Sequence, residues 1–304
     1  MAGARALTAA GAALAAAVVA AAPGPQVFRA SVDMASFAVT VTDRKGELAT
    51  GLSLDDFEVF EDGRPQRISL FARGDEPEAA PPLHLGLLFD ASGSMEDIIG
   101  FSRSAAIKFL NTVQEAEDIT LVIFDTQVRV ARYRQADFAR LVERIRQRRP
   151  DGQTALYDAL GVYLDGAASE DGRHVLVLYT DGGDTSSVMT FHEARDLLRA
   201  SDVTMYAIGF LSHLSRSSEF EQRLRLRTLA EATGGLAFFP GAADDLAATY
   251  ATIAAEVRGQ YTVGYLPSNA KTDGSWRKVE IRVKRPGAKV RARPGYYAPF
   301  RKGT

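Results

Sequence analysis

The chain has 304 residues, of which 46% are hydrophobic and 24% charged, and its formal net charge is -2. This length and composition allow a full hydrophobic core and indicate a folded protein of roughly two domains. The near-neutral charge gives no electrostatic drive toward nucleic acid, so we expect no nucleic-acid partner. Because the chain has no cysteine, disulfides, thiolate zinc sites, iron–sulfur clusters and a cysteine nucleophile are excluded.

The first 22 residues have the layout of a secretory signal peptide. Arg5 precedes an uncharged stretch rich in Ala, Leu and Val, and small residues come before Pro23. We expect cleavage within residues 20–22 and export to the periplasm, the cell surface or the medium. An uncleaved membrane anchor is the alternative, but the stretch is shorter than the ~20 residues of a span and alanine is only weakly hydrophobic. We therefore expect no membrane span after cleavage.

Residues 26–73 have the pattern of an all-β segment. FAVTVT, residues 37–42, alternates apolar and polar side chains as a strand does. LSLDDFEVFEDGRPQRISLF predicts a β-hairpin in which the strand of Phe57 pairs with the strand of Leu70 across a turn at residues 61–63.

Residues 74–82, GDEPEAAPP, have the composition of an exposed linker and predict a domain boundary. After this linker, continuous apolar strands alternate with helical patterns. The predicted strands are LHLGLLF, ITLVIF, VRVARY, HVLVLYT, VTMYAIGF and LAFFP, and the predicted helices lie around residues 99–113, 138–146, from 155, 191–200, 224–232 and 244–258. This alternation predicts a doubly wound, Rossmann-like α/β domain over residues 83–259, with a mostly parallel sheet covered by helices on both faces.

Residues 260–298 return to a strand pattern, with Val279, Ile281 and Val283 on one face of a strand. Neither β segment, at roughly forty residues, easily forms its own core. We therefore predict that residues 260–298 pack with residues 26–73 as a small β-sandwich-like domain. The basic runs at residues 282–293 and 140–149 are interpreted as solvated surface.

Ligands of doubly wound folds bind beyond the carboxyl ends of the strands. Oxygen-bearing side chains recur at such strand ends and at the start of a helix: Asp90, Ser92, Ser94, Thr154 and Asp181. Hydroxyl and carboxylate oxygens suit Mg²⁺ first, or Mn²⁺ or Ca²⁺, and Mg²⁺ usually keeps exchangeable waters. Asp158 and Asp184 are interpreted as supporting residues.

The pattern Asp90-x-Ser92-x-Ser94, then Thr154, then Asp181 before a glycine, resembles the metal-ion-dependent adhesion site of von Willebrand factor type A domains. The resemblance implies that Ser92, Ser94 and Thr154 contact the metal and that Asp90 and Asp181 help directly or through water. It also implies that a carboxylate of a partner protein completes the metal's ligand shell. The flanks, LSLDDFEVFEDGRPQRISLF and RARPGYYAP, resemble a bacterial family of exported proteins related to these domains. We therefore expect a metal-dependent protein-binding module and no enzyme.

Two alternatives stay open. The first is a structural scaffold with a vestigial metal site, in which Ser92, Ser94 and Thr154 are helix caps and the aspartates are turn residues. The second is a metal-dependent phosphoryl-transfer enzyme, because haloacid-dehalogenase-type phosphatases also place an aspartate after an apolar strand. Those enzymes need a second carboxylate two residues later, where this chain has Ser92. The histidines show no metal-binding spacing and are interpreted as surface or structural residues: His84, His174, His192 and His213. The sequence leaves the partner's identity and the oligomeric state open.

Overall fold

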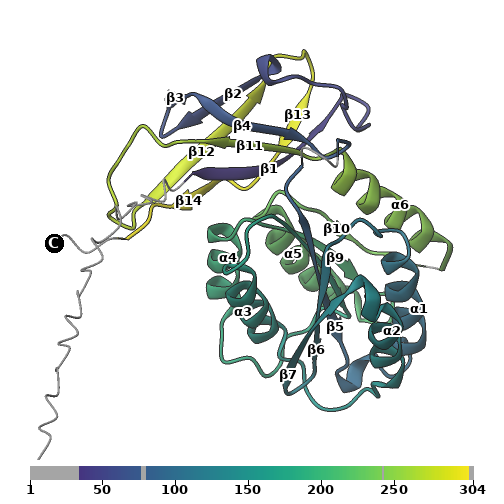
Figure 1. The fold of residues 1–304 in the computed structure, drawn as a ribbon. Coiled ribbons are helices and arrows are strands. Elements are labelled where there is room, and N and C mark those ends of the chain that lie inside the picture. Colours follow the sequence, from purple (N-terminus) through teal and green to yellow (C-terminus); the bar gives the residue numbers. More distant parts are fainter. Residues whose placement is uncertain (1–33, 77–79, 242, 301–304) are drawn as a thin grey trace, which may run out of the picture. The chain divides into compact units, whose positions relative to one another are not determined.

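The structure is a computed structural model and describes residues 34–76, 80–241 and 243–300 (Figure 1). These described residues belong to one compact unit. The predicted signal peptide lies outside the described residues and stays a prediction. Among the helices that the structure describes, none is long and apolar enough to cross a membrane.

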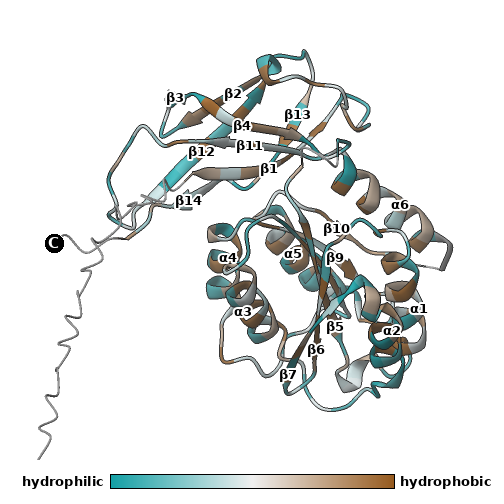
Figure 2. Cartoon of the chain, viewed as in Figure 1, coloured by the Kyte–Doolittle hydropathy of each residue, from teal (hydrophilic) through white to brown (hydrophobic). Residues whose placement is uncertain are grey.

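A mixed sheet forms the centre of the α/β part, and its described strands lie in the order β10-β9-β8-β5-β6-β7. Their bounds are β5 (Leu83–Asp90), β6 (Asp118–Phe124), β7 (Val128–Arg134), β8 (Arg173–Thr180), β9 (Val203–Gly209) and β10 (Ala237–Phe238). Neighbouring strands are parallel, except that β7 runs antiparallel to β6. Every residue of β5 is buried, and Figure 2 shows its hydrophobic colour. A strand that is apolar along its whole length needs cover on both faces.

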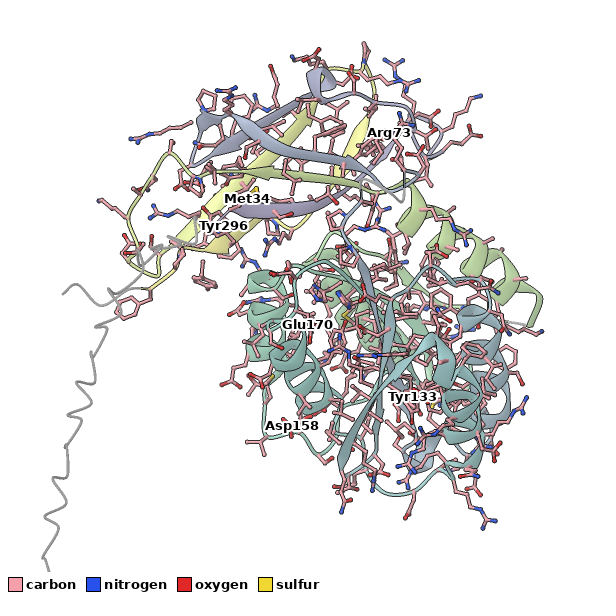
Figure 3. All side chains as sticks on the ribbon, in the orientation of Figure 1. Met34, Arg73, Tyr133, Asp158, Glu170 and Tyr296 are labelled. Carbon is pink, nitrogen blue, oxygen red and sulfur yellow. The ribbon has the colours of Figure 1, made fainter. Side chains whose placement is uncertain are left out.

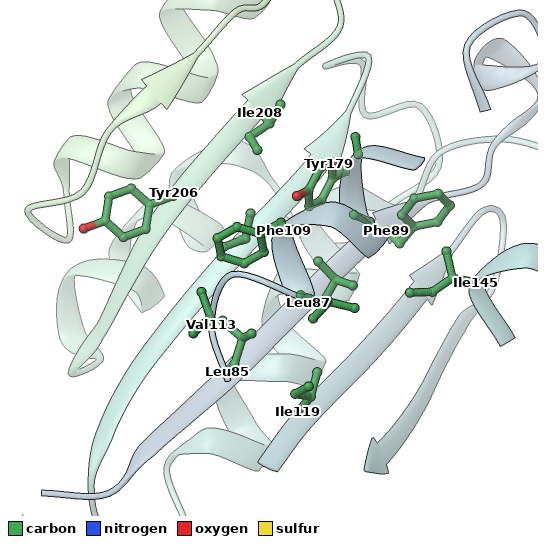
Figure 4. Close-up of a cluster of buried hydrophobic side chains, with 14 of the residues drawn as sticks. Leu85, Leu87, Phe89, Phe109, Val113, Ile119, Ile145, Tyr179, Tyr206 and Ile208 are labelled. Atoms are coloured by element: carbon green, nitrogen blue, oxygen red, sulfur yellow. The ribbon is translucent and has the colours of Figure 1, made fainter. Parts of the chain in front are cut away.

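Helices provide this cover. One face packs against α1 (Ile99–Leu110), α2 (Phe138–Gln147) and α6 (Ala243–Gly259), and Figure 4 shows part of that core. The other face packs against α3 (Leu156–Ala167), α4 (Phe191–Ala200) and α5 (Arg216–Glu231). The predicted doubly wound α/β fold is confirmed. Helix α5 begins earlier than the predicted start near residue 224, because Ser215 caps it by accepting a hydrogen bond from the Ser218 backbone N–H.

The remaining strands form two further sheets, with the described orders β13-β1-β11-β4 and β14-β12-β2-β3. Their bounds are β1 (Ala35–Thr42), β2 (Phe57–Glu61), β3 (Arg64–Gln66), β4 (Ile68–Arg73), β11 (Tyr261–Tyr265), β12 (Trp276–Val283), β13 (Lys289–Arg291) and β14 (Gly295–Tyr297). Short 3₁₀ turns are η1 (Leu54–Asp56), η2 (Gly93–Met95) and η3 (Gln135–Asp137).

Each of these two sheets contains strands from both ends of the chain. β11 lies between β1 and β4, and β12 pairs with β2. Side chains from both sheets share one hydrophobic core, and β12 alternates buried and exposed residues as predicted. The predicted β-sandwich-like part of the fold class is confirmed, while the domain boundaries at residues 26–73, 74–82, 83–259 and 260–298 stay predictions.

The predicted turn at residues 61–63 is confirmed, but the predicted pairing of the strand of Phe57 with the strand of Leu70 is wrong. β2 pairs with the short β3, and after Arg67 the chain crosses to the other sheet, where β4 pairs with β11. The apolar side chains of β2 and β4 meet across the core instead, with 5.4 Å between the ring centroids of Phe57 and Phe71. Apolar alternation shows which face of a strand is buried, and it does not show which sheet the strand joins.

The two basic runs are only partly solvated. Arg282 is exposed, as predicted, but Arg291 pairs with the buried Glu256 of α6. Arg293 is partly buried, and it donates hydrogen bonds to the carbonyl oxygens of Ser201 and Ser36, both at 2.7 Å. Arg148, in the other run, pairs with the buried Asp125. The interpretation of both runs as solvated surface is therefore wrong at these positions.

Replacing Arg293 by methionine is expected to lower the free energy of unfolding by about 2–4 kcal/mol. The variant keeps the apolar stem of the side chain but loses charged hydrogen bonds to backbone carbonyls, and such bonds each contribute about 1.5–3 kcal/mol. Urea unfolding measures the change. The matched control is Arg282→Met, which changes an exposed arginine and should shift stability by about 0.5 kcal/mol or less. Equal effects of the two substitutions would contradict the structural role of Arg293.

Candidate functional site

Strand β5 is the point at which the order of the central sheet reverses. The chain continues from β5 to β6 and β7 on one side, whereas β8, β9 and β10 lie on the other. Doubly wound folds bind ligands at the carboxyl ends of strands at such a reversal. Asp90 is the last residue of β5 and is fully buried.

Hydrogen bonds fix both oxygens of the Asp90 carboxylate. Oδ1 accepts from the Ser92 backbone N–H at 2.9 Å, and Oδ2 accepts from the Thr180 hydroxyl at 2.6 Å. Thr180 Oγ1 also accepts from the Gly182 backbone N–H at 2.9 Å. Asp90 therefore joins its own loop to the end of β8 and to the loop that contains Asp181.

Ser92 is buried and Ser94 is exposed, and their hydroxyl oxygens are 3.1 Å apart. Ser92 stands at the N-cap position of η2, but in the described structure its side chain makes no capping hydrogen bond. The N-cap residue of α1 is Ile98. The capping alternative is therefore wrong for the two serines, and their hydroxyls meet each other.

Thr154 is buried in the loop before α3, and the N-cap residue of that helix is Ala155. Backbone hydrogen bonds join this loop to the other two. Gly93 N donates to Gly152 O at 3.0 Å, and Thr185 N donates to Thr154 O at 2.9 Å. Gly152 has a φ of +72°, and a Cβ there would lie 2.4 Å from Thr126 Oγ1. The fold thus fixes the Thr154 loop between the serine loop and the loop of Asp181.

Asp181 directly follows β8 and is buried. Among the described residues, its Oδ2 atom has no hydrogen-bond partner. The neighbouring carboxylates do have partners: Asp184 Oδ1 accepts from the Ser187 hydroxyl at 2.5 Å, and Asp158 accepts from the backbone N–H groups of residues 188 and 189 at 3.0 and 2.9 Å. Asp158, at the start of α3, is labelled in Figure 3. Asp158 and Asp184 hold the loop in shape, and Asp181 keeps an oxygen without a donor.

Burial and the charge of Asp181 raise the pKa of Asp90 to about 7, although hydrogen bonds from Ser92 and Thr180 oppose the shift. The two buried carboxylates repel each other, and a bound cation would stabilise their negative charges. The donors beside them are hydroxyls, so the whole set consists of hard oxygen ligands that fit a divalent ion. Within the residues that the structure describes, no cluster of three or more His, Cys, Asp or Glu side chains could hold a metal. Any metal here therefore needs the hydroxyls.

Sequence reasoning missed several residues at this edge of the sheet. Thr180 precedes Asp181 in the chain, and it donates a hydrogen bond to Asp90. Asp125 follows β6 and is buried against Arg129 and Arg148. His213 lies in the loop after β9, with Nε2 3.8 Å from Asp181 Oδ2. A search of the loop after every parallel strand for polar side chains would have found Asp125 and His213.

His84 and His174 lie near the opposite ends of β5 and β8 from Asp90 and Thr180. Their rings stack with centroids 5.2 Å apart, and His84 Nδ1 lies 2.8 Å from Asp118 Oδ2. Burial lowers the pKa of His174, which favours its neutral form. These two histidines are structural, in agreement with the sequence interpretation, whereas His213 belongs to the candidate site.

A family model described as von Willebrand factor type A domain matches residues 84–250, which is more than half of the chain. An uncharacterized protein of Synechocystis sp. (strain PCC 6803) is 28% identical over 164 residues, covering 49% of this chain and 37% of that protein. The match thus spans well under half of that relative.

Solved structures show distant similarity. A von Willebrand factor type A protein from Catenulispora acidiphila has 13% identity and a TM-score of 0.49, covering 90% of this chain and 75% of its own. The proximal thread matrix protein 1 of the mussel byssus, with a zinc-occupied MIDAS motif, has 18% identity and a TM-score of 0.45, covering 62% and 48%. These TM-scores are below 0.5, so the fold assignment rests on the strand order and on the family match.

Proposed function

Because this chain belongs to the von Willebrand factor type A domain family, we propose that its candidate site binds a divalent cation and, through it, an acidic side chain of a partner protein. The proposed ligands are Asp90, Ser92, Ser94, Thr154 and Asp181. The proposed ion is Mg²⁺, with Mn²⁺ and Ca²⁺ as alternatives of the same chemical class.

The observation that carries this proposal is a group of side-chain oxygen atoms at one edge of the sheet that have no structural role in the described hydrogen bonds. Asp181 Oδ2 is buried without a donor among the described residues, and the serine hydroxyls do not cap a helix. A buried carboxylate oxygen without a donor is costly, and a structural scaffold gains nothing from one. A cation would offset this cost.

The exposed position of Ser94 indicates how a partner could reach the site. Asp90, Ser92 and Thr154 are buried, whereas Ser94 is open to solvent. With neutral hydroxyls as several of its ligands, a bound divalent ion keeps a net positive charge and attracts a further carboxylate. Asp90 holds the serine loop through Ser92 N, and Asp158 and Asp184 hold the Asp181 loop.

Export is part of the proposal and rests on the signal-like residues 1–22. The proposed partner is therefore a protein outside the cytoplasm that presents Asp or Glu. A phosphoryl-transfer enzyme is disfavoured, because the residue two positions after Asp90 is Ser92, whose hydroxyl lies beside that of Ser94. No carboxylate stands there to act as the general acid or base.

Capture of a partner from the extracytoplasmic fraction is expected in Mg²⁺ and is expected to be lost both in EDTA and in the Asp90→Ala, Ser92→Ala double variant. Loss of one charge-assisted contact costs about 1.5–3 kcal/mol, or roughly ten- to a hundredfold in affinity, and loss of the ion should cost more. Calorimetry with Mg²⁺ and Mn²⁺ measures binding of the ion directly.

Because Asp90 is buried, a Ser92→Ala, Ser94→Ala variant repeats the test without removing a buried charge. The matched control for the Asp90→Ala, Ser92→Ala variant is Ser104→Ala with Asp165→Ala, which changes one serine and one aspartate at exposed helix positions. A partner retained equally in Mg²⁺, in EDTA and in both site variants would overturn the proposal and favour a scaffold.

A further inference from the structure

The loop between β9 and α5, residues 210–215, lies at the same edge of the sheet as the proposed metal ligands. Phe210 N donates to Thr180 O at 2.9 Å, so the loop starts beside the end of β8. The buried Leu211 lies against Gly182, where a Cβ would come within 2.9 Å of its side chain. Leu214 N donates to Leu211 O at 3.1 Å and closes a turn that contains His213. The backbone thus fixes His213 next to the Asp181 loop.

The distance between His213 and Asp181 is too long for a hydrogen bond and short enough for both side chains to bind one ion. His213 Nε2 lies 3.8 Å from Asp181 Oδ2, the oxygen that has no donor in the described structure. Hydrogen bonds to a carboxylate from nitrogen are about 2.7–2.9 Å long. Two ligand atoms that each lie about 2.1 Å from one cation can be as far as about 4.2 Å apart. A cation between these two atoms would satisfy both.

We propose that His213 is a nitrogen ligand of the cation bound by this site and that it shifts the preference of the site from Mg²⁺ and Ca²⁺ toward Zn²⁺. The inference rests on the proposed function, because it concerns the same ion. Imidazole suits Zn²⁺, whereas Mg²⁺, Ca²⁺ and Mn²⁺ suit oxygen ligands. His213 thereby adds a ligand type that the aspartates, serines and threonine lack.

The side chain of His213 is free to make this contact. It is 37% exposed, whereas the side chain of Asp181 is 4% exposed. His213 therefore sits at the solvent side of the buried aspartate and does not contribute to the hydrophobic core. The described residues contain no cluster of three His or acidic side chains that could hold a metal. In the proposed site, His213 and Asp181 are therefore the direct nitrogen and carboxylate ligands, Asp90 acts through water, and the hydroxyls supply the remaining oxygens.

Pulsed electron paramagnetic resonance of the Mn²⁺-loaded full chain tests the ligand directly. The wild type should show the ¹⁴N coupling of a directly bound imidazole, and His213→Ala should lose it. The matched control is His192→Ala, which removes an exposed histidine of α4 and should leave the coupling unchanged. Bound Mn²⁺ without ¹⁴N coupling in the wild type would overturn the role of His213 and leave the proposed function intact.

Calorimetry with Zn²⁺ and Mg²⁺ tests the preference. His213→Ala is expected to weaken Zn²⁺ binding about tenfold or more, because loss of outer-shell partners already costs about 10–100-fold and a direct ligand contributes at least as much. Mg²⁺ binding should change much less. Equal weakening of both ions would overturn the inference. Absence of any divalent ion binding in the wild type would instead contradict the proposed function, so the two failures are distinguishable.

Discussion

Deleting residues 261–304 is expected to unfold the amino-terminal strands β1 and β4 together with the strands that are removed. In the described sheet, β1 lies between β11 and β13, and the neighbour of β4 is β11. The deletion takes away both neighbours of β1 and the neighbour of β4, and leaves β2 with the short β3. It also removes Tyr261, Val263 and Tyr265 from the shared core. Two-stranded remnants of this size are marginal in water.

Hydrogen–deuterium exchange measures this effect along the chain. Backbone amides of residues 35–42 and 57–73 should lose their protection in the deleted chain, whereas β5 and β8 provide an internal reference because their partners all remain. Protection of β1 and β4 that survives the deletion would show that these strands hold together without the carboxy-terminal ones. The shared β-sandwich-like arrangement would then be contradicted.

The sequence predicts the central α/β sheet well because its strands are buried on both faces. LHLGLLF and HVLVLYT are apolar along nearly their whole length, and surface strands lack this pattern. The β-sandwich is harder to predict, because alternation assigns a face and leaves the partner strand open. The Phe57–Leu70 hairpin fails for this reason. The inward position of Arg293 also escapes prediction, since a charged residue in a strand pattern is usually solvated.

The candidate site also contains residues that the sequence predicts and residues that it does not. Asp90, Ser92 and Ser94 are close in sequence. Asp181 follows a strand end, Thr154 lies at the start of a helix, and the carboxyl ends of parallel strands meet at one edge of the sheet. Thr180 was not found because a threonine inside a β-strand usually has no special role. His213 was not found because its approach to Asp181 depends on a turn within the loop after β9, which the residue types do not specify.

In metal-free buffer, the free energy of unfolding is expected to fall as the pH rises from about 4 to about 7, and Asp90→Asn should remove this part of the pH dependence. Burial and the charge of Asp181 raise the pKa of Asp90 from its ordinary value of 3.8 to about 7 in the folded state. The folded state therefore holds this proton more tightly than the unfolded state does. Its stabilising effect is complete below pH 3.8 and is lost by pH 7, which amounts to at most about 4 kcal/mol.

Urea unfolding in EDTA at several pH values between 4 and 8 measures the effect as the difference between wild type and Asp90→Asn, because titration of other groups is common to both. The control is Asp165→Asn, which changes an exposed carboxylate and should follow the wild type. Adding Mg²⁺ at pH 8 should stabilise the wild type, since an ion that binds only the folded state stabilises it by mass action, and should stabilise Asp90→Asn much less. Parallel pH profiles for wild type and Asp90→Asn would contradict the prediction, because they would show that the Asp90 carboxylate does not contribute to the pH dependence of stability. A gain from Mg²⁺ that survives the substitution would place the ion away from Asp90.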